Sequence, residues 1–274
     1  MYPVIFRIGG FELHTYGVML ALAFAVGIFL AVKRGKQYSF SFNQIYNISM
    51  IVVVSAIVGS RIAYVFLHLV EFQGRWWDTI SPIQSDGQIG ISGLVMLGGV
   101  IASAISVILY FRWKKLSTGK IADVLAPCLA LGFAIGKAGC FFNGCCFGKE
   151  CHLPWAMKFP PGSVAHYVYG DTPIHPTQLY AITGYLLIFI ILITTEKYKK
   201  FHGFLFALFL ILYGIFRFIN EIFRYYEGSE AGMKLLRFPG FDITFSQIVS
   251  LIMLAAGLIT IFIGNRRANI NAET

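Results

Sequence analysis

In the stretch GKAGCFFNGCCFGK, residues 136–149, a lysine near the end of a hydrophobic run is followed within nine residues by three thiols. Lys137 carries the charge, and Cys140, Cys145 and Cys146 follow it. A charge in an apolar environment is costly unless it faces a protein interior, a wet cavity or an anion. Thiols can act as nucleophiles, metal ligands or disulfide partners. This stretch is therefore a candidate chemical site.

Two arginines repeat the pattern of a cation inside an apolar run. At ~1.5 Å per helical residue, Arg61, Lys137 and Arg217 all lie ~21–26 Å from the same membrane boundary. Each alone could snorkel to the surface or close an ion pair between helices. Glu221 follows Arg217 by one helical turn, and Tyr213 precedes it by one turn. Three cations with one nearby acid favour an anionic ligand, and the commonest anion at a bilayer face is a lipid phosphate.

The elements that position these residues are predicted to be membrane helices. The chain is 57% hydrophobic and only 13% charged, with a mean hydropathy of +0.70, whereas soluble domains have roughly 25% charged residues. Seven apolar runs are each long enough to cross a bilayer as a helix, at 16–32, 44–70, 93–111, 121–142, 177–195, 203–223 and 243–263. We therefore predict an all-α polytopic membrane protein with about seven transmembrane helices, forming a single transmembrane domain over residues 1–274.

The basic residues predict an orientation for these helices. They follow the odd-numbered runs, as Lys33, Arg34, Lys36, Arg112, Lys114, Lys115, Lys120, Lys197, Lys199, Lys200, Arg266 and Arg267. By the positive-inside rule the N-terminus lies outside and the C-terminus inside. The connections 71–92, 143–176 and 224–242 then face outward, and 143–176 is the longer loop. The charge of +9 forms no basic stripe, so we expect no nucleic-acid partner.

The cysteines leave several interpretations open. Cys140 lies at helix depth, where a thiol packs well as a small apolar group. A loop disulfide could join Cys145 or Cys146 to Cys151 in an oxidising compartment. A zinc site from these three and His152 has enough ligands, but its spacing is not a familiar tetrahedral pattern. A cysteine nucleophile would imply a covalent lipid intermediate. No clear motif implies a metal or an organic cofactor, and we expect none.

Seven ordered segments resemble one family, the prolipoprotein diacylglyceryl transferases, over nearly the whole chain. They are HTYGVML at 14–20, GSRIAYV at 59–65, SGLVMLGG at 92–99, GKAGCFFNGCCFG at 136–148, LPWAMKFP at 153–160, HPTQLYA at 175–181 and YGIFRFINEIFR at 213–224. The resemblance implies a multi-pass protein of the bacterial inner membrane whose active site faces the outer leaflet. It also implies transfer of a diacylglyceryl group from phosphatidylglycerol to the cysteine thiol of a prolipoprotein signal peptide, with release of glycerol phosphate.

The resemblance and the charge pattern together predict the site residues. Lys137, Arg217 and Arg61 would bind phosphate and stabilise the leaving group, and Glu221 would orient Arg217. Tyr16 and Tyr213 would hydrogen-bond the lipid headgroup. The remaining expected substrate-binding positions are Asn143, Gly144, Gly148, Gln178, Arg224 and Gly98. The expected partners are phosphatidylglycerol, the signal peptide and membrane lipids.

Four positions depart from the family pattern. Leu97 occupies the place of a histidine that is a candidate base, and Lys137 that of an arginine. Cys140 replaces an asparagine, and Ala181 replaces a glutamate. Leucine cannot take a proton, so a base would come from elsewhere, and the expected candidates are His14 and His175.

These departures leave three possibilities, namely the family's reaction with a rearranged base, a lipid transfer to another acceptor, and a lipid-binding protein without activity. A quinone-linked thiol oxidoreductase is disfavoured because the chain has no C-x-x-C pair. An anion transporter is disfavoured because no internal repeat is evident.

Overall fold

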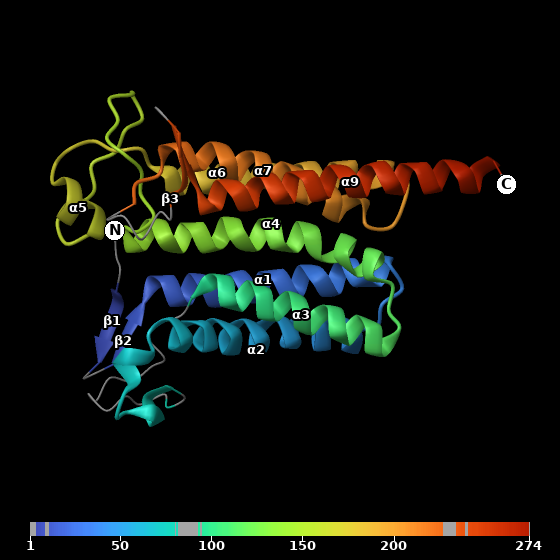
Figure 1. Ribbon diagram of the computed structural model, residues 1–274, viewed down its shortest axis with the longest axis horizontal. Helices are drawn as coiled ribbons and strands as arrows, with labels where there is room; N and C mark the ends of the chain where they lie inside the picture. The colour runs from blue at the N-terminus through green and yellow to red at the C-terminus, as the bar shows by residue number, and fades with distance from the viewer. Residues whose placement is uncertain are drawn as a thin grey trace. The chain divides into compact units, whose positions relative to one another are not determined.

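The structure is a computed structural model that describes residues 4–8, 11–79, 81, 93, 95–226, 234–238 and 241–273. The described helices longer than ten residues are α1 (Thr15–Gln37), α2 (Phe42–Leu67), α3 (Met96–Lys114), α4 (Thr118–Asn143), α6 (Thr177–Thr195), α7 (Phe204–Phe223) and α9 (Phe245–Glu273). Shorter helices are α5 (Val164–Tyr169), η1 (Leu69–Phe72), η2 (Trp76–Thr79) and η3 (Glu196–Tyr198). Figure 1 labels most of these elements.

The prediction of an all-α membrane protein with seven spanning helices is confirmed. Seven of the described helices are long and apolar enough to cross a membrane. Their bounds match the predicted runs closely, except that α2 ends at Leu67 and α9 continues to Glu273. The predicted outward connections 71–92 and 224–242 lie partly outside the described residues. The orientation of the termini stays a prediction.

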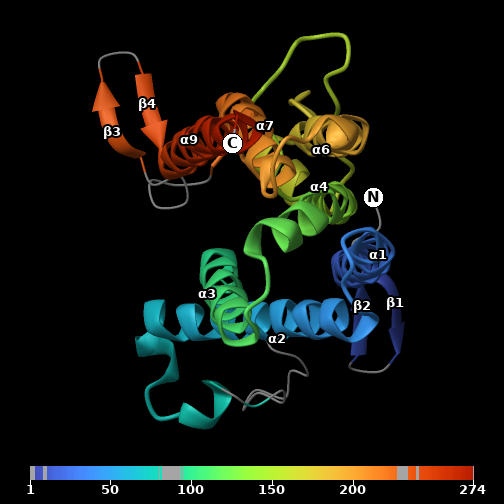
Figure 2. The same cartoon turned by 90° about the vertical axis from the view of Figure 1, so that its right-hand side faces the viewer.

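Two β-hairpins are absent from the sequence-based prediction. Strands β1 (Val4–Ile8) and β2 (Phe11–His14) form one two-stranded sheet, and β3 (Lys234–Phe238) pairs antiparallel with β4 (Phe241–Thr244) in another. Each second strand ends one residue before a spanning helix begins, α1 after β2 and α9 after β4 (Figure 2). Strands of four or five residues carry too little periodicity to be distinguished from loop sequence.

Two compact units can be described separately. One contains residues 1–5, 14–30 and 119–274, and the other contains 6–13 and 31–118. The expectation of a single transmembrane domain stays a prediction. The cysteine-rich stretch, α4, α6, α7 and α9 all belong to the first unit, and Arg61 belongs to the second.

The second unit is organised by close contact between α2 and α3. A Cβ placed on Gly98 would lie 2.3 Å from Ala63 Cβ and 2.5 Å from the carbonyl oxygen of Gly59. Small residues that let helix backbones approach are typical of membrane interfaces. Gly98, predicted to bind substrate, therefore has a packing role in this structure.

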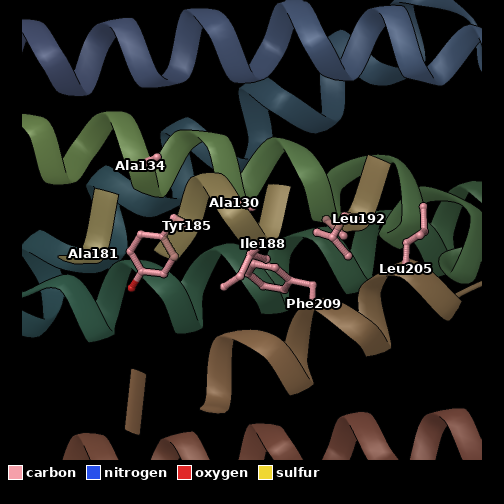
Figure 3. Close-up of a cluster of buried hydrophobic side chains, with 9 residues drawn as sticks. Ala130, Ala134, Ala181, Tyr185, Ile188, Leu192, Leu205 and Phe209 are labelled. Atoms are coloured by element: carbon pink, nitrogen blue, oxygen red, sulfur yellow. The ribbon is translucent and has the colours of Figure 1, made fainter. Parts of the chain in front are cut away.

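In the first unit, α4, α6 and α7 share an apolar core (Figure 3). Small residues of α4, including Ala130 and Ala134, face larger ones such as Tyr185 of α6 and Phe209 of α7. Helix α7 also packs along α9, where a Cβ on Gly214 would lie 2.6 Å from the carbonyl oxygen of Ser250. These contacts fix the ends of the four helices, where the polar residues gather.

A buried carboxylate joins α4 to the start of α7. Asp123 is fully buried. Its Oδ2 accepts from the backbone N–H of Gly203 at 2.8 Å, and its Oδ1 accepts from those of Leu205 at 2.8 Å and Phe206 at 3.2 Å. The first N–H groups of a helix have no partner within the helix and carry its positive dipole end. Asp123 satisfies three of them from a neighbouring helix.

Replacement of this cap should weaken the first unit. We expect Asp123→Asn to lower the free energy of unfolding by about 1–3 kcal/mol, because the amide loses the charge and can accept through only one oxygen. The measurement is a denaturant titration of both proteins in the same detergent. Asp171→Asn, at an exposed loop position, is the matched control and should leave the unfolding midpoint unchanged. Equal destabilisation by both substitutions would contradict the capping role.

Candidate functional site

A buried carboxylate on α7 collects the polar groups of the candidate site. Glu221 is 4% exposed, and it accepts hydrogen bonds from Arg217 Nη1, from the Tyr226 hydroxyl at 2.5 Å and from Thr244 Oγ1 at 3.0 Å. Arg224 Nη1 lies 3.9 Å from it. The predicted Arg217–Glu221 pair is thus present, and a second arginine shares the same carboxylate.

The start of α9 completes this arrangement. Arg217 Nη2 donates to Ser246 Oγ at 3.1 Å. Thr244 forms a capping box with Gln247, because its hydroxyl accepts from the Gln247 N–H at 3.3 Å and the Gln247 side chain accepts from the Thr244 N–H at 3.0 Å. The cap holds the Thr244 hydroxyl in place beside Glu221. Sequence analysis missed Tyr226, Thr244 and Ser246, and only the T-x-x-Q pattern of the cap was a readable signal.

The three cysteines of the opening stretch converge at the end of α4. Their sulfur atoms all lie within 4.8 Å of one another. The Gly144 N–H donates to the Phe141 carbonyl at 3.2 Å and the Cys145 N–H to the Cys140 carbonyl at 3.1 Å, with Gly144 in the left-handed region at φ 70°. This is a Schellman motif, which brings the side chains of the residues at its two ends together. Gly144 is therefore the sequence signal that could have predicted the Cys140–Cys145 contact.

Two buried side chains of α6 hold the turn that follows. Gln178 Nε2 donates to the carbonyl of Cys145 at 2.8 Å, and Thr177 Oγ1 donates to that of Cys146 at 2.7 Å. Cys146 itself has φ 60°, which is uncommon for a residue other than glycine. Gln178, predicted to bind substrate, here positions the cysteine turn.

Neither of the two loop disulfides that the sequence left open, Cys145–Cys151 and Cys146–Cys151, is present in the structure. All five cysteines are among the described residues, and none of them forms a disulfide. Cys151 is buried, and its sulfur accepts from the Leu153 N–H at 3.4 Å. The Schellman turn instead folds Cys145 onto Cys140.

Charges link the cysteine cluster to the cations. Hydrogen bonds from the thiols of Cys140 and Cys145 lower the pKa of the Cys146 thiol, and the charges of Lys137 and Arg224 act in the same direction. Lys137 and Arg224 therefore act on the same thiol, while Arg224 and Arg217 share Glu221. Three cations against one carboxylate leave this group with two surplus positive charges.

Lys137 has the fewest polar contacts of the three cations, counted over the described residues. It is half-buried, six residues before the end of α4, and no hydrogen bond or ion pair joins it to the described part of the chain. Arg224 Nε is buried and unpaired among the described residues, and its guanidinium lies 4.8 Å from the centre of the Tyr226 ring. Both retain donors that an anion could accept.

Arg61 differs from these cations. Its Nε donates to the Thr79 carbonyl at 3.0 Å, its Nη1 to that of Gly93 at 3.3 Å and its Nη2 to that of Asp78. Its guanidinium also lies 5.2 Å from the centre of the Phe72 ring. Arg61 is 7% exposed and fastens the segment after α2, so the structure gives it an anchoring role in its own unit.

The two candidate bases lie in different surroundings. His175 Nδ1 is 3.1 Å from the Tyr180 hydroxyl, which accepts a hydrogen bond from Trp155 Nε1 at 2.8 Å. Burial lowers the pKa of His175, and the charge of Lys149 lowers it further, so the ring is neutral at neutral pH. His14 is exposed, at the end of β2.

The remaining predicted residues divide between the cluster and the core. Tyr16 is 41% exposed and lies beside Gly139, within the electrostatic reach of the three thiols. Asn143 is the last residue of α4, two positions before Cys145. Tyr213 stacks on Tyr185, their ring centres 5.8 Å apart, within the aromatic core.

Gly148 has a packing reason. A Cβ there would lie 2.5 Å from that of His175 and 2.7 Å from two carbonyl oxygens, those of His175 and Phe223. Its N–H donates to the His175 carbonyl at 3.0 Å, so the loop after α4 crosses the ends of α6 and α7 at this residue. Leu97, at the position of the family histidine, is 45% exposed and belongs to the other unit.

A cavity of about 560 Å³ lies away from these residues. Its lining includes Lys199 and His202, from the segment between η3 and α7, and Arg267 of α9. The basic residues predict that this region is cytoplasmic. It therefore does not coincide with the candidate site.

Comparisons with known proteins cover almost the full chain. Residues 3–263 match the family model described as prolipoprotein diacylglyceryl transferase. Three similar proteins are named phosphatidylglycerol–prolipoprotein diacylglyceryl transferase. The one from Clostridium tetani is 30% identical over 94% of this chain and 96% of its own length. Those from Campylobacter hominis and Finegoldia magna are each 33% identical over 93% of this chain, and over 88% and 93% of their own lengths.

Removing the charge of Glu221 should destabilise the protein. We expect Glu221→Gln to cost about 3 kcal/mol of unfolding free energy, because Arg217 and Arg224 would lose their shared counter-charge in a buried setting. The measurement is denaturant unfolding in detergent, with Arg217→Gln and the double variant completing a cycle. The double variant should be less destabilised than the sum of the two single changes.

The matched control is Glu150→Gln, since among the described residues the ion pair of Glu150 is with exposed His152 at 3.4 Å, and exposed pairs contribute little. Additive effects of Glu221→Gln and Arg217→Gln would contradict a direct coupling between the two side chains.

Proposed function

Because the chain belongs to the prolipoprotein diacylglyceryl transferase family, we propose that it transfers a diacylglyceryl group from phosphatidylglycerol to the thiol of a prolipoprotein cysteine. The observation that carries the proposal is the full-length match together with a cation cluster suited to a phosphate. In this reaction the cysteine sulfur attacks the glyceryl carbon, the carbon–oxygen bond to phosphate breaks, and glycerol phosphate leaves. A thioether links the lipid to the peptide.

The cations would act on the leaving group. Lys137 and Arg224 retain unused donors, and Arg217 is held by Glu221 and Ser246. Negative charge grows on the phosphate oxygen as the carbon–oxygen bond breaks, so fixed cations stabilise the transition state more than the bound lipid. Lysine gives up the bidentate geometry of arginine but keeps the charge.

The orientation predicted from the basic residues supports a site at the outer leaflet of the bacterial inner membrane. Arg217 precedes the last residue of α7 by six positions, and Lys137 precedes that of α4 by six. The basic residues predict that both of these helix ends face outward. A signal peptide bound at that face would present its cysteine at the depth of the lipid glyceryl group. His14 and His175 are the histidines we propose as candidate bases.

The alternatives of a different acceptor or of binding without activity predict other outcomes. In a reconstituted system with phosphatidylglycerol vesicles and a lipobox peptide, mass spectrometry should detect the diacylglyceryl adduct on the peptide cysteine. Binding of the lipid by folded protein without an adduct would contradict the proposed reaction and favour one of those alternatives.

Lys137 is the best position at which to test the phosphate role. Its side chain makes no hydrogen bond or ion pair within the described residues, so its replacement should not disturb the fold. We expect Lys137→Met to lower the transfer rate by about 100-fold, with the unfolding midpoint unchanged. Lys137→Arg should retain activity. Lys158→Met, at an exposed position of the loop after α4, is the control for loss of one positive charge. Equal rates for Lys137→Met and wild type would remove Lys137 from the reaction.

Reporter fusions test the orientation on which this placement rests. A periplasmic alkaline phosphatase reporter fused within the loop 143–176 should be active, and one fused after residue 273 inactive. The reverse pattern would place the cation cluster at the cytoplasmic face and contradict the proposed location.

A further inference from the structure

The cysteine cluster is a built feature of the first unit. The Schellman turn at Gly144 folds Cys145 onto Cys140, and the turn that follows brings in Cys146. Gln178 and Thr177, each 1% exposed, hold the two carbonyls of this turn. A non-glycine residue in the left-handed region costs free energy, and such strain concentrates at functional sites. Two independent side chains stabilise the strained arrangement, which argues against chance proximity of the thiols.

The spacing of the sulfur atoms suits a metal ion. A tetrahedral zinc ion with Zn–S bonds of about 2.3 Å places its sulfur ligands about 3.8 Å apart, and the three sulfurs here lie within 4.8 Å of one another. Small side-chain rotations close that difference. No fourth histidine, cysteine, aspartate or glutamate of the described residues joins the group. Three protein ligands with one open position are the pattern of catalytic rather than structural zinc.

We propose that Cys140, Cys145 and Cys146 bind a zinc ion whose fourth position accepts the thiol of the peptide substrate. The inference rests on the proposed function, and it answers the problem raised by Leu97. A thiol bound to zinc is deprotonated outright, so the metal would supply the nucleophilic thiolate and would take the place of the candidate bases His14 and His175. The cluster and the missing histidine then belong to one rearranged mechanism.

The chemical step balances with no oxidant or reductant. The peptide thiol displaces a zinc-bound water and releases its proton to solvent. A lone pair of the bound sulfur then forms the bond to the glyceryl carbon, and the pair of the carbon–oxygen bond leaves with glycerol phosphate. The resulting thioether is neutral and a weaker ligand than a thiolate, so water replaces it and the site is restored.

The surrounding cations suit the charge of the proposed metal complex. Zinc with three thiolates carries a net charge of −1, and this rises to −2 when the substrate thiolate binds. Lys137 lies three residues before Cys140 on α4, and Arg224 forms a backbone bridge with Gly148, two residues after Cys146. Positive charges near the site stabilise such an anionic complex. A soft thiolate set also excludes calcium and magnesium, which prefer oxygen ligands.

Metal analysis of the full-length protein, purified in detergent without chelators, tests the site directly. We expect elemental mass spectrometry to find about one zinc ion per chain in the wild-type protein. The Cys145→Ser and Cys146→Ser variants should each contain less than a tenth of that amount of zinc. Cys128→Ser and Cys151→Ser are the matched controls, since both residues are buried cysteines outside the cluster, and both variants should keep the metal.

Cobalt substitution of the wild-type protein should give thiolate charge-transfer absorption. Addition of the lipobox peptide should change the visible absorption bands of the cobalt ion as the peptide thiol binds to it.

The transfer assay separates this inference from the proposed function. If wild-type protein makes the adduct, zinc removal by a strong chelator should abolish transfer and added zinc should restore it. An adduct formed at an undiminished rate by metal-free protein would overturn the zinc site while leaving the transferase function intact. Zinc binding that persists in Cys145→Ser and Cys146→Ser, or binding of copper alone, would also overturn it. Zinc bound as predicted with no adduct would contradict the proposed reaction instead, and the cobalt spectrum would show whether the peptide thiol still enters the site.

Discussion

The candidate site depends on one buried carboxylate. Glu221 holds Arg217 and Arg224 together and also receives the hydroxyls of Tyr226 and Thr244. Without it, two guanidinium groups near the end of α7 would repel each other in a medium that screens charge poorly. With Glu221 present, the two guanidinium groups and the carboxylate together carry one net positive charge at a fixed position. The carboxylate therefore sets the position of the charge and leaves enough of it uncompensated to attract an anion.

The helix ends around this carboxylate are held by polar contacts between elements distant in the sequence. Asp123 of α4 caps α7 at one end, and Thr177 and Gln178 of α6 hold the turn after α4 at the other. Buried backbone groups need partners, and in lipid water supplies none. The same requirement that stabilises the helix ends also fixes the orientation of the cysteines and of Arg217.

The sequence predicts the seven helices and the Arg217–Glu221 pair well, because each depends on residues close together in the chain. Hydrophobic runs mark the helices, and a spacing of one turn marks the pair. The hairpins were missed because four- or five-residue strands carry little signal. The contacts of Glu221 with Thr244, and of Arg61 with three loop carbonyls, depend on residues 17 or more positions apart, and no local pattern encodes them. The cysteine cluster is only partly predictable from the sequence. Gly144 indicates the Schellman turn that joins Cys140 and Cys145, but the position of Cys146 depends on contacts with α6.

The departures from the family pattern are easier to understand together than singly. Loss of a histidine at Leu97 would leave the thiol of a substrate protonated at neutral pH, since an ordinary cysteine titrates near pH 8.5. The same chain gathers three thiols beside two cations at the end of α4, where the family signature has a single asparagine at the position of Cys140. A thiolate metal site changes the pKa of a bound thiol by direct coordination, which is a larger effect than hydrogen bonding to a neutral base. If a metal site replaces the histidine base, histidine is no longer needed at position 97. The three cysteines then depend on one another, because loss of any one of them would remove the metal and with it the activation of the substrate thiol.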